Sequence, residues 1–198
     1  MVLVELGSIS TAVLPIAEFA NHLHLGTGFA EDGDETAILE AYLRAGISAI
    51  ETRIGKAMIT REYSWQLTQW HRPDQQVLPV APVSAITEIR LVDAAGTSQV
   101  VDPDSYYLVK DSQRPRLVSA VGAFPSIASA GGVEIDFQAG YGPAWSDMPV
   151  DLAQAVFLLA AHYYENRHAT SDRDGLIPFG VMALIETYRK VRILGGGA

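Results

Sequence analysis

The segment from Met148 to His168, M-P-V-D-L-A-Q-A-V-F-L-L-A-A-H-Y-Y-E-N-R-H, constrains the fold more than any other part of the chain. Its apolar side chains recur at the i, i+3, i+4 and i+7 spacing of one helical face, which predicts an amphipathic helix. Pro149 suits the first helical turn because it lacks an N–H group, and Asp147 is placed to cap the free amides of that turn. The apolar face is formed by Leu152, Ala155, Val156, Leu159, Ala160 and Tyr163. Because the remaining polar strip is narrow, the sequence predicts a buried helix with neighbours on several sides.

Three further segments have helical spacing. They cover residues 15–25, residues 35–54 and a last segment that Pro178 opens. Gly46 lies within the apolar stripe of the 35–54 segment, so we expect another helix to approach closely there.

Between Met58 and Phe137 the apolar period changes from about 3.6 residues to 2, with turn residues between short runs. This pattern predicts an antiparallel meander of about six strands with one buried face. The predicted fold class is therefore α+β: a mainly helical bundle of about four helices, with an antiparallel β-sheet insertion over residues 58–138 between the second and third helices. At 198 residues we expect a single domain over 1–198.

Composition excludes several classes of protein. The chain has no cysteine, so disulfides, thiolate nucleophiles and zinc sites that need sulfur are excluded. Its net charge of −9 makes tight binding to a nucleic-acid backbone unfavourable. The first residues lack the basic and apolar regions of a secretory signal, and no apolar run is long enough to span a membrane. We therefore expect a protein that is made in the cytoplasm and has no membrane partner.

Residues that could carry chemistry do not form a recognisable site. His22 and His24 are two positions apart on a predicted helix, so their rings point to nearly opposite sides. His162 and His168 lie about 240° apart around a helix. The Asp-rich turn at residues 172–175 lacks the third oxygen ligand and the glutamate of a calcium-binding loop. Phosphate loops, dinucleotide fingerprints and nucleophile elbows are also missing. We expect no catalytic residues, no metal site and no cofactor.

Residues 149–167 combine a Pro-x-x-Leu-x-x-Ala-Val helix with a closing Tyr-Glu-Asn-Arg. This signature is formed by Pro149, Leu152, Ala155, Val156, Tyr164, Glu165, Asn166 and Arg167. Four other stretches precede this signature in the chain. In order they are L-P-I-A-E-F-A-N-H-L, A-I-E-T-R-I-G-K-A-M-I-T with R-E-Y-S-W-Q-L, L-P-V-A-P-V-S-A-I-T-E-I and V-E-I-D-F-Q-A-G-Y-G. Together these stretches resemble the head–tail connector (adaptor) family of tailed bacteriophages and gene transfer agents.

The resemblance implies a structural protein of the virion or gene transfer agent particle. It implies a homo-oligomeric ring, usually of twelve subunits, that docks beneath the portal protein. The ring would carry a neck, stopper or tail-terminator protein, and DNA would pass through its channel without specific binding. In this family the C-terminal helix and tail engage the portal, which transfers to the tail at residues 188–198 of this chain. The portal-binding residues implied are Tyr188, Arg189, Lys190, Val191, Arg192, Ile193 and Leu194.

The residues themselves leave alternatives to this interpretation. The basic C-terminal end also complements a helix dipole, so it is compatible with a frayed helix end that has no partner. Another virion neck component, such as a stopper or tail terminator, would share this composition and assembly. A small cytoplasmic enzyme would need a cleft with perturbed titratable groups. We further expect Tyr164, Glu165 and Arg167 to act structurally, with Glu165 or Arg167 bonded to a neighbouring loop.

Overall fold

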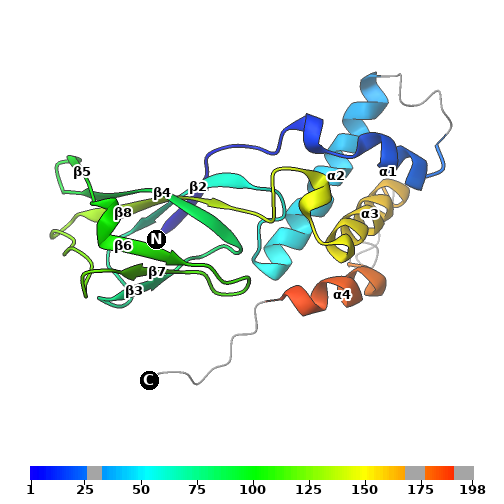
Figure 1. The fold of residues 1–198 in the computed structure, drawn as a ribbon. Helices are drawn as coiled ribbons and strands as arrows, with labels where there is room; N and C mark the ends of the chain where they lie inside the picture. Colours follow the sequence, from blue (N-terminus) through cyan, green and yellow to red (C-terminus); the bar gives the residue numbers. More distant parts are fainter. Residues whose placement is uncertain (26–32, 168–176, 190–198) are drawn as a thin grey trace. The chain divides into compact units, whose positions relative to one another are not determined.

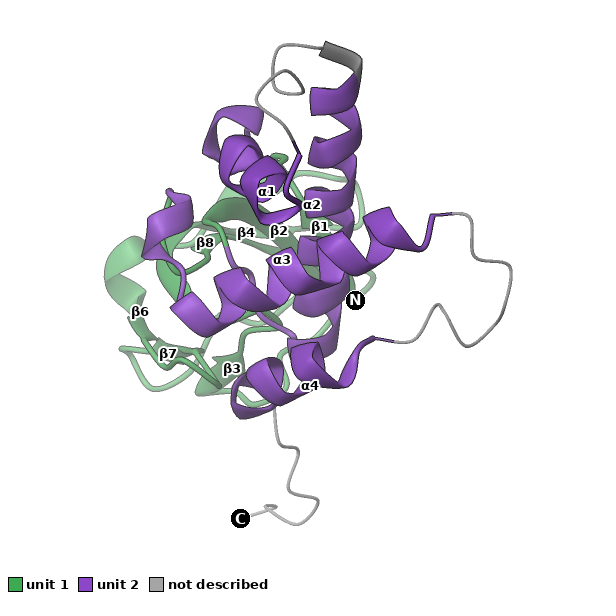
Figure 2. Cartoon of the chain, turned by 90° about the vertical axis from the view of Figure 1, so that its right-hand side faces the viewer, with its two compact units in different colours: residues 1–9, 59–143 green, residues 10–58, 144–198 purple. Residues whose placement is uncertain are grey.

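A computed structural model describes residues 1–25, 33–167 and 177–189. The chain divides into two compact units, which Figure 2 shows in different colours. Residues 1–9 and 59–143 form a unit of strands, called here the sheet unit. Residues 10–58 and 144–198 form a unit that contains the helices, called here the helical unit.

The sheet unit contains two antiparallel sheets, whose strands β2 to β8 are labelled in Figure 1 and whose strand β1 is labelled in Figure 2. The larger sheet has the order β1-β2-β8-β4-β5 and the smaller has the order β3-β7-β6. The strands of the larger sheet are β1 (Val2–Glu5), β2 (Arg61–Leu67), β8 (Gly132–Ala139), β4 (Val83–Val92) and β5 (Ser98–Val100). Those of the smaller sheet are β3 (Gln75–Val77), β7 (Arg116–Ser119) and β6 (Tyr106–Val109), which follows a 3-10 turn at Pro103–Ser105.

The larger sheet has one apolar face and one polar face, as its period of two predicts. Every second residue of β8 is buried and the residues between are half-buried. The register pairs Tyr63 with Phe137, and their rings stack at 5.6 Å between centroids. On the opposite face Arg90 forms ion pairs with Glu134 and Asp136 at 3.2 Å and 2.8 Å. The alternation therefore places the core on one side of the sheet and a charged network on the other.

Gly140 allows the chain to turn directly after β8. Its φ angle is +142°, and a Cβ atom there would lie 2.4 Å from the backbone nitrogen of Thr60. Only glycine can therefore bring these two segments so close together.

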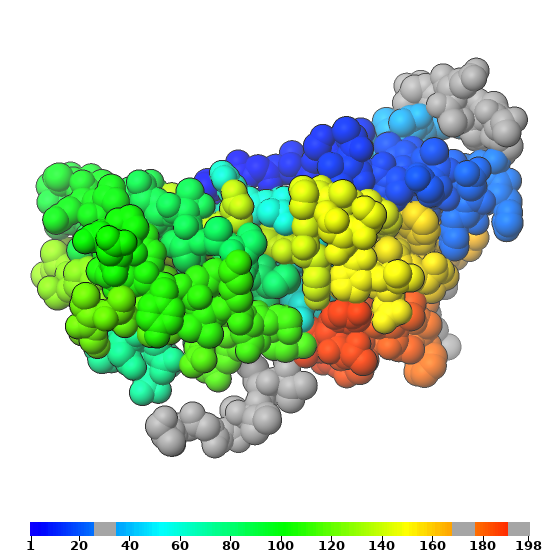
Figure 3. All heavy atoms as spheres, in the orientation of Figure 1, coloured from blue at the N-terminus to red at the C-terminus, as the bar shows by residue number. Residues whose placement is uncertain are grey.

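The helical unit contains four α-helices in its described part: α1 (Ile16–His22), α2 (Gly33–Ile54), α3 (Val150–Glu165) and α4 (Phe179–Ile185). Short 3-10 turns lie at Thr11–Val13, Trp145–Asp147 and Glu186–Tyr188. Figure 3 shows α4, in red, directly beside the yellow and orange atoms of α3. None of the described helices is both long enough and apolar enough to cross a membrane.

The buried amphipathic helix predicted within residues 148–168 is confirmed as α3, and residue 168 lies outside the described part of the chain. The buried side chains of α3 are Leu152, Ala155, Val156, Leu159 and Ala160, all members of the predicted face. The close approach expected at Gly46 is also confirmed, because a Cβ atom there would lie 3.3 Å from the carbonyl oxygen of Val156. The two helices α2 and α3 pack against each other at this point.

The predicted cap of this helix is wrong. Pro149 occupies the N-cap position, and no side chain caps α3. The Asp147 carboxylate instead accepts the N–H of Ala144 at 2.8 Å. Asp147 belongs to the preceding 3-10 turn, and its side chain folds back to satisfy a free amide of that turn.

The predicted fold class needs a correction. The class α+β holds, but the protein is not a mainly helical bundle with one inserted meander, because eight described strands form two separate sheets with a large share of the buried side chains. Strand β1 adds the N-terminal residues to the larger sheet, ahead of all the helices. The predicted organisation of the chain, a single domain over 1–198 with an insertion at 58–138 and a tail at 188–198, stays a prediction.

Candidate docking site at the C-terminal end

The Tyr-Glu-Asn-Arg signature closes the C-terminal end of α3. The Arg167 guanidinium lies over the Tyr164 ring at 4.7 Å from its centroid, and Arg167 Nη1 donates to the Tyr164 carbonyl at 2.8 Å. Asn166 Nδ2 donates to the carbonyl oxygen of His162 at 2.9 Å. The His162 carbonyl also accepts the backbone N–H of Asn166 at 3.0 Å, so Asn166 reinforces a bond that the helix already makes. The Tyr164 carbonyl is among the last of the helix, which lack partners within it, and Arg167 supplies its hydrogen bond.

The same signature connects α3 with α2. The Tyr164 ring meets the Tyr42 ring of α2 edge to face, with centroids 5.7 Å apart and an interplanar angle of 84°. Such pairs stabilise packing beyond the area that they bury. Glu165 is exposed, and residues 168–176, which follow the signature, lie outside the described part of the chain. The expected bond from Glu165 or Arg167 to a neighbouring loop stays a prediction.

The predicted portal-binding segment begins at a tethered tyrosine. The Tyr188 hydroxyl is hydrogen-bonded to the Asp151 carboxylate in the first turn of α3. Lys56 directly follows the turn that ends α2, and only 2% of its surface is exposed. Its Nζ atom lies 5.9 Å from the centroid of the Tyr188 ring. Burial of the hydroxyl and the negative charge of Asp151 raise the pKa of Tyr188. Tyr188 is therefore held between the segment that directly follows α2 and the first turn of α3.

The residue after this tether remains exposed. Arg189 Nη1 pairs with Glu186 Oε1 at 2.8 Å, and both side chains are open to solvent. An exposed ion pair of this kind contributes little, so a stronger partner can displace it. The other predicted docking residues, Lys190, Val191, Arg192, Ile193 and Leu194, lie outside the described residues.

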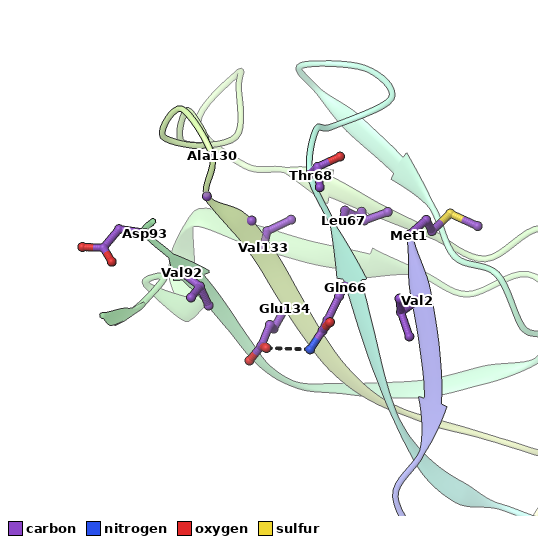
Figure 4. A pocket seen from close by; sticks show the side chains of 12 residues that line it. Met1, Val2, Gln66, Leu67, Thr68, Val92, Asp93, Ala130, Val133 and Glu134 are labelled. Atoms are coloured by element: carbon purple, nitrogen blue, oxygen red, sulfur yellow. Dashed lines mark hydrogen bonds between the residues drawn. The ribbon is translucent and has the colours of Figure 1, made fainter. Parts of the chain in front are cut away.

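A shallow hollow of about 270 Å³ lies in the sheet unit, where β2 ends and β8 begins (Figure 4). Its carboxylates are engaged in local bonds: Glu134 accepts from Gln66 Nε2 at 2.9 Å, and Asp93 accepts the backbone N–H groups of Ala95 and Thr97, both at 2.8 Å. These bonds lower the pKa of Asp93. No histidine lines the hollow, and in the described ranges no group of three or more His, Cys, Asp or Glu residues could hold a metal ion. The two carboxylates of the hollow are therefore engaged in hydrogen bonds with neighbouring protein groups.

Solved structures of gene transfer agent (GTA) particles contain chains that are similar to this chain over nearly its whole length. The neck of an empty GTA particle, computed with C6 symmetry, contains a chain with 54% identity and a TM-score of 0.89, covering 99% of both chains. The chain belongs to the head–tail connector family.

Two other structures agree with this assignment. A chain in the virion of a native GTA particle has 53% identity and a TM-score of 0.87. A chain in the neck of a native GTA particle computed with C12 symmetry has 49% identity and a TM-score of 0.84. Each covers 99% of this chain and 99% of the other. No protein-family model matches the chain, and no curated protein matches it. These neighbours are parts of a particle, so this connector is a structural neck protein and the interpretation as a small enzyme is wrong.

Sequence reasoning about this connector missed part of the site. Lys56 and Asp151 hold Tyr188, but they lie on two segments far apart in the sequence that only tertiary packing brings together. The one signal in the sequence was the position of a lysine within an apolar stretch, I-G-K-A-M-I, where a charged residue is expected to have a buried partner.

Proposed function

We propose that this connector is a head–tail adaptor that forms a ring of twelve subunits beneath the portal of a phage or gene transfer agent particle. The ring joins the head to the neck and tail and lines the channel through which DNA passes. The observation that carries this proposal is 54% identity, over 99% of both chains, to a chain in the neck of a GTA particle. The twelve-subunit ring is supported by the C12 symmetry with which a related neck was computed.

The charge of the protein suits a channel for DNA. A net charge of −9 repels the phosphate backbone, so DNA passing through a ring of such subunits would meet few sites that hold it. This charge balance supports a channel that does not bind DNA specifically. The proposed partners are the portal above the ring and a stopper or tail-terminator protein below it.

The C-terminal segment from Tyr188 to Leu194 is the proposed portal-binding element. Lys190 and Arg192 add positive charge to an acidic protein, while Val191, Ile193 and Leu194 supply apolar anchors. The tether of Tyr188 to Asp151 supports the proposal, because it fixes the first residue of this segment against α3. A frayed helix end would not need a fixed point of this kind.

Removal of residues 190–198 tests the docking element. This truncation keeps Tyr188 and Arg189, so the protein should melt at nearly the normal temperature. It should nevertheless fail to join portal-bearing heads, which would leave filled heads without tails. The matched control removes only residues 195–198, the Gly-Gly-Gly-Ala end, and should assemble normally. Tailed particles at the usual yield from the longer truncation would show that portal docking lies elsewhere.

A further inference from the structure

The first six residues expose an unusual amount of apolar surface. Of the eleven large hydrophobic side chains that are exposed in the described part of the chain, five lie here. Their exposed fractions are 82% for Met1, 52% for Val2, 40% for Leu3, 44% for Val4 and 55% for Leu6. An apolar patch on the surface of an assembly protein indicates a contact with another protein.

These side chains lie on an outer strand whose second edge is open. Among the strands that the structure describes, β1 pairs with β2 alone, and it is the outermost strand at one edge of the larger sheet. Figure 4 shows Met1 and Val2 on this strand, beside Gln66 of β2. The Leu6 N–H donates to the Glu62 carbonyl at 2.8 Å. In an antiparallel ladder the bonded positions alternate, so Leu3 and Glu5 direct their N–H and C=O groups away from β2.

The apolar side chains cover both faces of this strand. The register places Val2 and Val4 opposite Gln66 and Ser64, on the polar face of the sheet, and Leu3 opposite Trp65, on the apolar face. A second strand laid along β1 would therefore gain main-chain hydrogen bonds and apolar contacts on both sides.

Other outer strands of the described sheets carry protection that β1 lacks. Proteins guard open edges with lysine, proline, bulges or very short strands. Strands β3 and β5 are three residues long, and β6 is followed directly by Lys110. Strand β1 has neither lysine nor proline, and its pairing with β2 runs without a register shift. Its one charge, Glu5, pairs with Arg61 at 3.4 Å.

We propose that β1 is a lateral joint of the ring, at which a main-chain edge of the adjacent copy of this chain adds to the larger sheet. This inference rests on the proposed ring. A cyclic ring of more than two subunits needs two different surfaces on each copy, one for each neighbour. The relatives lie in necks computed with C6 and C12 symmetry, so a second copy is the protein that such an assembly places beside this one. Strand β1 supplies one of the two surfaces.

Leu3→Pro tests strand addition directly. Proline removes the outward N–H of residue 3 but leaves the β1–β2 hydrogen bonds intact, and outer strands tolerate proline at such positions. The variant should melt normally, and electron microscopy with purified portal should show closed rings at least tenfold less often than for the wild type. The matched control Leu3→Val keeps the N–H and the apolar side chain, and should form rings normally.

The outcomes separate the two proposals. Closed rings of Leu3→Pro at the wild-type frequency overturn the joint at β1 and leave the ring proposal standing. Failure of the wild type to form a ring on the portal overturns the proposed function itself.

A second variant keeps the test valid if Leu3→Pro does not fold. The chain has no cysteine, so Leu3→Cys carries a single thiol that a benzophenone maleimide can label. After assembly on the portal and irradiation, an adduct between two copies of this chain is expected. An adduct with the portal or with no protein would contradict the proposal.

Discussion

Strand β8 and helix α3 are the central elements of their units, and they bury their side chains differently. Strand β8 alternates strictly, so its polar face carries Glu134 and Asp136 within the ion-pair network of Arg90. Helix α3 leaves only a narrow polar strip, and its buried positions contact α2 and α4. The sheet unit therefore depends on one densely packed face, whereas the helical unit depends on close approach between helix backbones. Substitutions that separate these two kinds of packing test the comparison.

The largest effect is expected for Phe137→Ala in the sheet unit. The Phe137 side chain is fully buried and stacks on Tyr63, so its loss should lower the free energy of unfolding by about 3–5 kcal/mol. Phe157→Ala in α3 is the matched substitution in the helical unit. Phe157 is half-buried and stacks on Trp145, so its loss should be smaller. Urea denaturation of both variants measures the difference, and an equal or larger loss for Phe157→Ala would contradict it.

Gly46→Val should show that the helical unit depends on backbone approach. The added side chain meets the Val156 carbonyl and the Ala160 nitrogen, and such overpacking destabilises by about 1–3 kcal/mol. Gly180→Ala in α4 is the control, because a Cβ atom there meets nothing within 4 Å. Alanine favours a helix over glycine by about 1 kcal/mol at most, so this variant should be unchanged or more stable. If the two variants shifted the melting temperature in the same direction, close packing at Gly46 would not be the cause.

Tyr188→Phe tests the tether within the helical unit. It removes the hydroxyl that binds Asp151 but keeps the ring beside Lys56, so the loss should be about 0.5–1.5 kcal/mol. The raised pKa of Tyr188 means that the folded protein holds this proton more tightly than the unfolded chain. The tether therefore contributes to the free energy of unfolding at pH values below the ordinary tyrosine pKa. This contribution is lost as the pH rises through the pKa of Tyr188 in the folded protein. Tyr107→Phe, at an exposed position of β6, should change stability little at any pH.

The smallest effect is expected for Glu40→Gln in α2. Hydrogen bonds from Arg44 and then Thr11 lower the pKa of Glu40. A lowered pKa stabilises the folded protein at pH values above the ordinary pKa of glutamate. This contribution is lost as the pH falls through the pKa of Glu40 in the folded protein. The variant should lose less than about 1 kcal/mol at neutral pH, since the pair is near the surface. Melting curves at pH 7 and at acidic pH check this, and a difference that persists in acid would point to packing instead of charge.

The sequence predicted some elements well because their signal is local. The 3.6-residue spacing along α3 and the alternation along β8 both follow from which side chains are apolar. Strand β1 was missed because V-L-V-E is apolar on both faces and has no alternation. The division into two sheets was missed because strand order depends on pairing between distant segments.

The candidate site was predicted only in part. Helical spacing and the family resemblance identified Tyr188 and the basic segment after it. The contacts of Tyr188 with Lys56 and Asp151 join three segments that are far apart in the sequence, so no local sequence pattern predicts them. The resemblance also identified the residues of the Tyr-Glu-Asn-Arg signature. The structure shows what two of them do: the side chains of Asn166 and Arg167 donate hydrogen bonds to carbonyls in the last turn of α3.

Electron microscopy of the purified protein with and without purified portal tests the central claim most directly. We expect single copies or weak associations in dilute solution, and a closed ring of this chain on the portal when the two are mixed. Twelvefold averaging of that ring should place the C-terminal segment against the portal. A portal that stays bare at micromolar concentrations of both proteins would contradict the assignment of this protein as the head–tail adaptor.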